Sequence, residues 1–157
     1  MENENKEYLT KEKYDELEKE LAFLTTTKRK EIADQLEFAK SLGDISENAE
    51  YHEAREQQAL TEDRINKIEN VLKNAEIVEY KKSDTVVIGS TVTVKKEGER
   101  ENREFILVGS EEADTIAGKI SHNSPIGQAL MGKKKEEEFN FKTPGGDKIK
   151  YKIISVK

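Results

Sequence analysis

The chain has 157 residues, of which 38% are charged and 34% hydrophobic, a composition with room for one ordinary domain or two small ones but for no large core. It contains no cysteine, which excludes disulfides, thiolate metal sites and cysteine nucleophiles. The formal net charge of −6 is concentrated in the first half, and because phosphate contacts need cations, that half is a poor direct binder of nucleic acid.

The first predicted element is a helix that begins after Thr10, a suitable N-cap residue, with Leu9 and Tyr14 spaced as a hydrophobic staple. Its apolar positions follow a heptad pattern that slips in register near Lys28. These positions are Tyr14, Leu17, Leu21, Leu24, Ile32, Leu36 and Ala39. Gly43 is expected to end the helix.

A second helix keeps a stricter heptad spacing of alternating three and four residues. Its seam consists of Tyr51, Ala54, Gln58, Thr61, Ile65, Ile68, Leu72 and Ala75. Only the few residues from Gly43 to Ser46 separate the two helices, so they must run antiparallel, as a hairpin about 45 Å long at ~1.5 Å per residue. We therefore predict an antiparallel α-helical coiled-coil hairpin at residues 1–78, with an acidic tip at residues 43–48.

After about residue 78 the hydrophobic period changes from helical to alternating. The segments predicted as strands are 86–94, 104–108, 139–141 and 149–154. A strong turn signal falls at 143–147, and a short helix is predicted at 124–132, entered through proline and left through glycine. The sequence thus predicts an α+β chain, in which residues 79–157 form an antiparallel β-sheet domain with a short helix.

Asp44 and Glu47 stand three residues apart between the two predicted helices. Neighbours on one helical turn can close on a single hard cation such as Mg²⁺, although two carboxylates leave most of its octahedral shell to a partner. The same spacing matches a capping box, in which Asp44 caps the second helix and Glu47 bonds back. Spacing alone leaves both interpretations open, and the position at the end of a long arm favours the first.

The other polar residues form no complete catalytic or metal site. His52 and His122 are far apart in sequence and fall in different predicted domains, which argues against a zinc site or a Ser-His-Asp arrangement. For Tyr51 and Arg55, packing and ion pairing compete with roles in binding. The short basic run 28–30 is either a solvated face or a contact for a nucleic-acid backbone.

Two blocks of the sequence resemble the bacterial Gre family of transcript cleavage factors, the GreA type in particular. The first block is the tip with the start of the second helix, residues 43–58, and the second is residues 124–133 with 143–146. The resemblance spans nearly the whole chain and implies an FKBP-like fold for the C-terminal domain. It also implies a transcription elongation factor that is not itself an enzyme but stimulates the RNA-cleavage activity of RNA polymerase.

The family resemblance implies that the C-terminal domain docks on bacterial RNA polymerase while the coiled coil enters the secondary channel. There Asp44 and Glu47 would help to hold Mg²⁺ that is shared with the polymerase active centre and not tightly bound by the isolated protein. The polymerase would then cleave the 3′ end of backtracked RNA, and the factor would meet nascent RNA and DNA only through the elongation complex. The residues implied in partner contacts are Ser46, Asn48, Tyr51, Arg55, Ser124, Pro125, Ile126 and Gly127.

An alternative function is a regulator that occupies the same channel and inhibits or modulates the polymerase without cleavage; the intact Asp44 and Glu47 argue against it. Lys30, Lys40 and Ile45 depart from the family pattern, and none of them is one of the two carboxylates. Because the heptads are satisfied within the hairpin, we expect a monomer. The start of the chain lacks the features of a signal peptide and no run is apolar enough to span a bilayer, so we expect a cytoplasmic protein without membrane contact.

Overall fold

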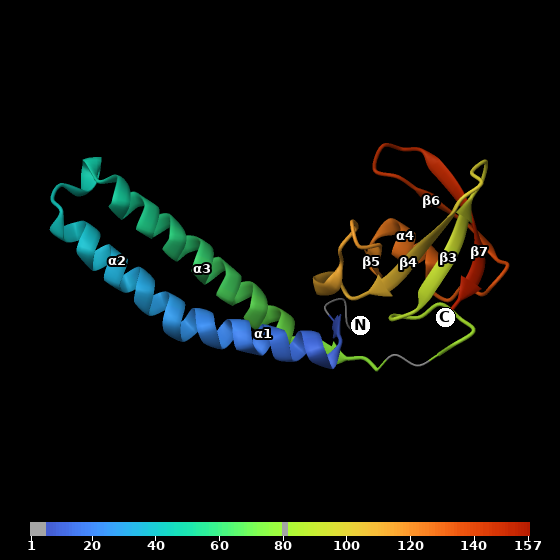
Figure 1. The fold of residues 1–157 in the computed structure, drawn as a ribbon, viewed down its shortest axis with the longest axis horizontal. Helices are drawn as coiled ribbons and strands as arrows, with labels where there is room; N and C mark the ends of the chain where they lie inside the picture. Colours follow the sequence, from blue (N-terminus) through green and yellow to red (C-terminus); the bar gives the residue numbers. More distant parts are fainter. Residues whose placement is uncertain (1–5, 80–81) are drawn as a thin grey trace. The chain divides into compact units, whose positions relative to one another are not determined.

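A computed structural model provides the fold, and it describes residues 6–79 and 82–157. The chain divides into two compact units (Figure 1). The arm is Glu12–Ala75, and the sheet unit is Met1–Lys11 together with Glu76–Lys157. This division differs from the predicted domains, 1–78 and 79–157, because the segment before the first helix belongs with the sheet unit.

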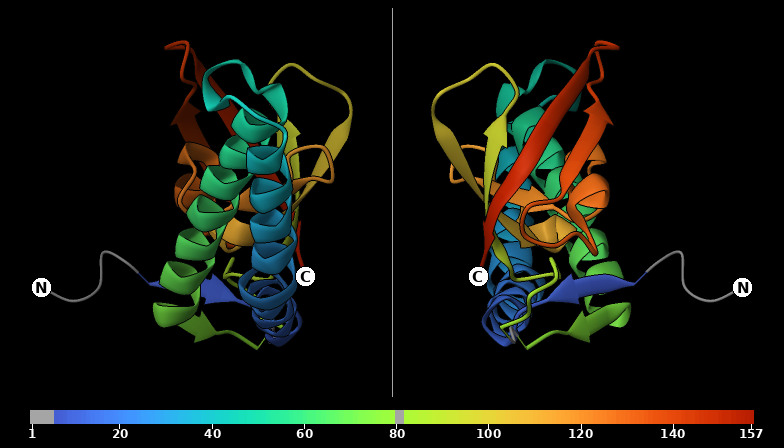
Figure 2. Two further views of the ribbon diagram at one scale, coloured as in Figure 1. Left: turned by 90° about the vertical axis from the view of Figure 1, so that its left-hand side faces the viewer. Right: turned by 90° about the vertical axis from the view of Figure 1, so that its right-hand side faces the viewer.

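The arm is a hairpin of two antiparallel helical stretches. The first stretch consists of α1 (Lys11–Phe23), a π-helical segment (Leu24–Lys28) and α2 (Arg29–Ser41). A 3-10 turn (Ile45–Glu47) leads into α3 (Ala49–Lys73), the second stretch. Figures 1 and 2 show α2 and α3 side by side, which confirms the predicted hairpin. Every helix within the described residues is too short or too polar to cross a membrane.

The π-helical segment explains the slip in the heptad register. Leu24 and Ala39 are fifteen residues apart, one more than two heptads, and a π turn takes up one extra residue. As a result Leu17 before the segment and Ile32 and Ala39 after it are all buried. The slip predicted near Lys28 is therefore confirmed and has a structural cause.

Polar contacts hold the two helical stretches in register. Arg29 donates two hydrogen bonds to the carboxylate of Glu62, both at 2.8 Å. Arg64 donates two to the carboxylate of Glu20, at 2.7 and 2.8 Å, and these lower the pKa of Glu20. Exposed pairs of this kind contribute little to stability because water and salt screen them, so their main effect here is to fix which residues of the two stretches face each other.

The predicted seam of α3 is confirmed by its burial. Ala54, Thr61, Ile65 and Ile68 are buried, and the remaining helical members of the seam are half-buried. Ala75 lies beyond the helix, in a short strand. The seam is small and polar near the tip and aliphatic near the base, so the apolar contacts of the arm are concentrated at its base.

The sheet unit contains a five-stranded sheet in the order β5-β4-β3-β7-β6 (Figure 1). Its strands are β3 (Thr91–Lys96), β4 (Asn102–Val108), β5 (Lys119–Ser121), β6 (Glu138–Lys142) and β7 (Lys148–Val156). Neighbouring strands are antiparallel except β4 and β5, which run parallel. The predicted α+β fold class is confirmed. The prediction of a wholly antiparallel sheet is wrong at this one edge.

The core of the sheet unit lies on the face of the sheet that α4 (Pro125–Leu130) covers. Its buried members are Val86, Val92, Val94, Leu107, Leu130, Phe139, Tyr151 and Ile153. Within it the ring of Tyr151 stacks on Phe139 and Phe141, with centroids 5.6 and 5.8 Å apart. Stacked aromatic rings add to the free energy gained by burial.

The predicted strand at 86–94 begins only at Thr91. Before it the chain makes a tight turn in which the amide of Ser90 donates to the carbonyl of Val87 (3.0 Å), and Gly89 has a φ of 93°. Glycine adopts such an angle without steric cost. The run of branched residues therefore belongs partly to a turn, although Val86 is still fully buried.

A second, two-stranded sheet pairs β1 (Glu7–Leu9) with β2 (Ala75–Ile77). β1 is anchored on the sheet unit: the Thr10 hydroxyl donates to Glu112 (2.9 Å), and Leu9 is fully buried. Gly109 comes so close that a Cβ on it would lie 1.8 Å from the carbonyl oxygen of Tyr8. The sequence did not predict these strands, which are only three residues long.

Candidate functional site

The tip of the arm is built on a sharp turn followed by a single turn of 3-10 helix. Gly43 has a φ of 123°, and a Cβ there would meet nothing within 4 Å, so glycine is favoured by the backbone angle and not by crowding. Asp44 caps the 3-10 turn: its Oδ1 accepts from the amide (3.0 Å) and the hydroxyl (2.9 Å) of Ser46. Glu47 is the last residue of this turn.

Asn48, and not Asp44, caps α3. Its Oδ1 accepts from the amide of Tyr51 at 3.1 Å, and its Nδ2 donates to the carbonyl of Ala39 at the end of α2. The capping-box interpretation of Asp44 and Glu47 is therefore wrong, because Glu47 makes no hydrogen bond back within the part of the chain that the structure describes. Both carboxylates are left available for a ligand.

The two carboxylates are exposed and border one hollow of about 420 Å³ at the tip. The hydrogen bonds from Ser46, that from its backbone amide first, hold the pKa of Asp44 below its ordinary value, so this carboxylate is ionised at neutral pH. The hollow is also lined by Leu42, Ala49 and Glu50. Sequence reasoning missed these three because the contact follows from the fold of the turn and not from a spacing pattern.

The donor atoms at the tip fit a hard cation but do not complete its shell. Carboxylate oxygens are the ligands that Mg²⁺ prefers, and the ion commonly takes its remaining ligands from water and substrate phosphates. Within residues 6–79 and 82–157, no three His, Cys, Asp or Glu side chains gather closely enough to hold a metal ion. The tip alone therefore offers Asp44 and Glu47 as a partial set of ligands.

The other predicted residues of the first block have local roles. Ser46 positions Asp44, and the ring of Tyr51 is half-buried with its edge against His52, centroids 5.9 Å apart. Arg55 is exposed and donates to the side-chain oxygen of Gln58 at 2.7 Å. Contacts of these residues with a partner stay predictions.

The second block has a structural explanation of its own. Ser124 caps α4: its hydroxyl accepts from the amide of Gly127 (3.1 Å) and donates to the carbonyl of Ser121 (2.6 Å). A Cβ on Gly127 would lie 2.0 Å from that carbonyl oxygen. Pro125 is exposed at the first turn of α4, and Ile126 packs partly against the core. Docking through these four residues stays a prediction, and Pro125 is the most accessible of them.

The two histidines lie in different units. His52 is exposed on α3. His122 is half-buried, with Tyr8 at its ring edge, centroids 5.1 Å apart, and its Nδ1 lies 3.4 Å from the carbonyl oxygen of Val108. His52 follows Glu47 by only five residues, whereas His122 belongs to the other unit and has a packing role.

Comparison with known proteins covers both units. The family described as "Transcription elongation factor, N-terminal" matches residues 7–77, and the one described as "Transcription elongation factor, GreA/GreB, C-term" matches residues 81–157. The chain is 48% identical over 159 residues to transcription elongation factor GreA of Clostridium acetobutylicum, with all of both chains covered. It is 43% identical over 149 residues to GreA of Bacillus subtilis, with 94% of each covered. Among solved structures, Gfh1 of Thermus aquaticus is 27% identical and covers 97% of this chain and 98% of its own, with a TM-score of 0.45, which is too low to support a structural conclusion.

Proposed function

The chain belongs to the GreA/GreB family of transcription elongation factors, and from that premise we propose that it delivers Asp44 and Glu47 to the active centre of RNA polymerase to stimulate transcript cleavage. The observation that carries the proposal is the tip itself. Both carboxylates are exposed at the far end of a two-helix arm, and Asn48 has taken over the capping of α3. Neither carboxylate is therefore needed to cap α3, and the one structural task of Asp44 is to cap the short 3-10 turn.

The two units have different roles: the arm extends to the active centre, and the sheet unit attaches to the polymerase. The arm is narrow, since a helix with its side chains is about 10–12 Å across, and it enters the secondary channel of bacterial RNA polymerase. The sheet unit attaches at the rim, where exposed Pro125 is available to a partner. Attachment raises the effective concentration of the tip at the active centre, to the millimolar range for a short connection. The factor meets nascent RNA and DNA within the elongation complex, as a monomer.

At the active centre the tip contributes oxygen ligands that are already in place. One carboxylate oxygen of Asp44 is engaged by Ser46, which fixes the orientation of the group and leaves the other oxygen to bind Mg²⁺. Glu47 supplies a second carboxylate from the same turn, and the polymerase supplies the remaining ligands. When bound between Asp44, Glu47 and the ligands of the polymerase, Mg²⁺ would supply the activation of water and the stabilisation of the leaving oxygen that phosphodiester hydrolysis needs. In this scheme the chain is an accessory factor, and the polymerase performs the cleavage of backtracked RNA.

The test uses a stalled, backtracked elongation complex with labelled RNA. Asp44→Asn and Glu47→Gln should each abolish stimulated cleavage while binding polymerase with nearly the affinity of the unchanged protein. Glu53→Gln is the matched control, because Glu53 is an exposed acidic residue of α3 and its loss changes the net charge equally; this variant should cleave normally.

Two outcomes would contradict the proposal. Cleavage at the unchanged rate by both tip variants would show that the carboxylates are not the delivered groups. Binding to polymerase with inhibition and no cleavage by the unchanged protein would favour the alternative of a channel-binding regulator. Incubation of labelled RNA with the protein in the absence of polymerase should give no hydrolysis.

A further inference from the structure

Five lysines of strands β3, β6 and β7 lie on the outer face of the sheet, on the side away from the core. We call the set the lysine face: Lys95 of β3, Lys142 of β6, and Lys148, Lys150 and Lys152 of β7. Residues that oppose each other across an antiparallel pair lie on the same side of a sheet, and Lys95 opposes Lys152 while Lys142 opposes Lys148. The alternate residues of β7 turn to the core instead.

The lysine face carries an excess of positive charge. Lys150 pairs with Glu138 at 2.8 Å and Lys152 with Glu136 at 2.9 Å, and these contacts raise the pKa of both lysines. The other three have no ion-pair partner among the residues that the structure describes. Glu138 is the one acidic side chain of β6 and β7, both described in full. Glu104 of β4 lies on the same side of the sheet, since it opposes Thr93, and Glu97 acts on Lys150, so the excess rests on Lys95, Lys142 and Lys148.

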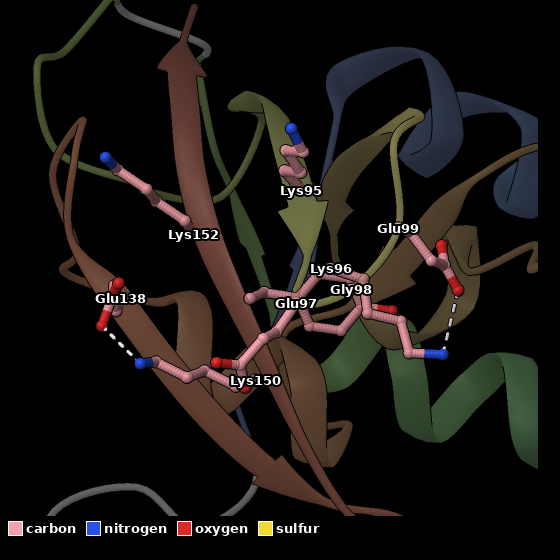
Figure 3. Close-up of a pocket in the computed structure, with 9 residues that line it drawn as sticks. Lys95, Lys96, Glu97, Gly98, Glu99, Glu138, Lys150 and Lys152 are labelled. Atoms are coloured by element: carbon pink, nitrogen blue, oxygen red, sulfur yellow. Dashed lines mark hydrogen bonds and ion pairs between the residues drawn. The ribbon is translucent and has the colours of Figure 1, made fainter.

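The spacing of the lysines is regular. Alternate residues of a strand lie about 6.8 Å apart, and duplex DNA carries closely spaced phosphates, one per ~3.4 Å of the helix axis on each strand. Lysines at 148, 150 and 152 therefore form an even row that can contact several phosphates at once, with Lys95 and Lys142 beside the two ends of the row. Next to Lys95, Lys150 and Lys152 is a hollow of about 390 Å³; Figure 3 shows its lining and the pair between Lys150 and Glu138.

The lysine face lacks the side chains by which other partners are held. No large exposed apolar residue of the described chain lies on it, whereas protein interfaces depend on aromatic and aliphatic anchors. Surfaces that hold single-stranded nucleic acid use aromatic rings for stacking, and the rings of Phe139, Phe141 and Tyr151 belong to the core side. Lysine alone suits a partner that presents only its backbone.

We propose that the lysine face binds the phosphate backbone of duplex DNA without reading its sequence. The site is separate from the carboxylates of the tip, and it lies in the unit whose charge is not dominated by acidic residues. Nonspecific binding of this kind is weak, with a Kd of about 10⁻⁴ to 10⁻⁶ M at physiological salt, and falls steeply as salt rises. Such contacts would add to the attachment of the sheet unit wherever duplex DNA lies beside it.

The test measures fluorescence anisotropy of a labelled duplex with the full-length protein over a range of salt. The variant K148Q/K150Q/K152Q should bind the duplex more than tenfold more weakly at low salt. A plot of the logarithm of its binding constant against the logarithm of the salt concentration should have a slope shallower by up to about 0.9 per lysine removed. The matched control is K82Q/K134Q/K135Q, which removes three exposed lysines of the same unit that lie outside the strands of the sheet; its affinity should stay within twofold.

Three results would overturn the proposal. They are undetectable duplex binding by the unchanged protein at low salt, equal affinities for the two triple variants, and single-stranded DNA or RNA of the same length binding at least as tightly as the duplex. If nucleic-acid-free polymerase lost affinity for the first variant alone, the lysine face would be a protein-docking surface. Asp44→Asn should bind duplex normally, so this test and the cleavage test fail independently.

Discussion

The arm and the sheet unit are held together in different ways. In the sheet unit, buried side chains from four strands and α4 form one cluster, and Val92, Leu107, Leu130 and Ile153 are at most 1% exposed. In the arm, buried residues form a line along two helices, and toward the tip the line narrows to alanines such as Ala39 and Ala54. The structure of the tip thus depends on a few hydrogen bonds, whereas that of the sheet unit depends on burial.

This difference teaches where each unit tolerates change. Removing a large side chain from a cluster leaves a cavity that many neighbours border, and the cost rises with the cavity that remains. Two helices in contact along one seam can move closer to each other and so fill part of such a cavity. The tip has almost no buried volume to lose, so substitutions there are expected to change its chemistry more than its stability.

The largest effect is expected from matched truncations of one buried isoleucine in each unit. Ile153→Ala should lower the free energy of unfolding by about 3–5 kcal/mol and Ile65→Ala by about 2–3 kcal/mol, although both side chains are at most 1% exposed. Hydrogen exchange followed by mass spectrometry would report the loss in each unit separately. Equal losses would show that the seam of the arm is packed as rigidly as the sheet.

A smaller effect should follow from inserting one alanine after Thr27, within the π-helical segment. The π turn already takes up one extra residue, so a second extra residue turns everything beyond it by about 100° relative to α1 and takes Ile32 off the seam. The expected loss is about 2–3 kcal/mol, the value of burying one large aliphatic side chain. Deleting Thr27 is the control, since the segment can then become regular α-helix with Ile32 still on the seam. Unchanged amide protection in α2 of the insertion variant, or equal losses for the insertion and the deletion, would refute the link between the π turn and the seam.

Asn48→Ala should cost about 1–2 kcal/mol, because the N-cap of α3 is lost. Asp44→Ala should cost less, since Asp44 caps only an exposed 3-10 turn. Thermal unfolding of the helices, followed by circular dichroism at about 222 nm, would rank the two. Asn48→Asp keeps the acceptor for the amide of Tyr51 and loses only the donor to Ala39, so it should fall between them. A larger loss for Asp44→Ala would restore the capping-box interpretation.

The smallest effect concerns the charge of the tip. Ser46→Ala removes one of the two hydrogen bonds to Asp44 and leaves that from the backbone amide, so the pKa of Asp44 should rise partway toward its ordinary value. A lowered pKa favours the folded state above the unfolded-state pKa and loses that effect as pH falls through the folded-state value. In the variant this loss should be smaller and should be complete at a higher pH. An NMR titration of the carboxyl carbon measures the pKa, and an unchanged value would mean that the hydroxyl contributes nothing.

Periodic features of the molecule were predictable from sequence. The seam of α3 and the slip near Lys28 follow from the spacing of apolar residues, which a helix converts directly into a buried line. The cap of α3 was not predictable in the same way, because Asp44-x-x-Glu47 matches a capping pattern as well as Asn48 does. The choice depends on the 3-10 turn between them, which places Asn48 beside Ala39.

Short or interrupted elements were not predictable. β1, β2 and β5 have three residues each, too few to show alternation, and the partner of β1 is far away in the sequence. The β-branched residues 86–88 before Thr91 are typical of a strand, and only Gly89 after them indicates a turn. At the candidate site, the two carboxylates were identified by spacing and resemblance, but the hollow that they share with Leu42 arises from the path of the backbone.

The pairing of β1 with β2 makes the arm an insertion into the sheet unit, because the chain leaves for the arm from one strand and returns through its neighbour. Cutting the chain once, after residue 78, would therefore strip the C-terminal fragment of a strand that it needs. The cleaner excision replaces residues 12–75 with a short loop between two strands that are already adjacent. For the same reason, both helices of the hairpin can be lengthened or shortened by equal amounts while the sheet unit stays unchanged. The length of the arm can therefore be altered, in evolution or by design, without changing the unit that attaches to the partner.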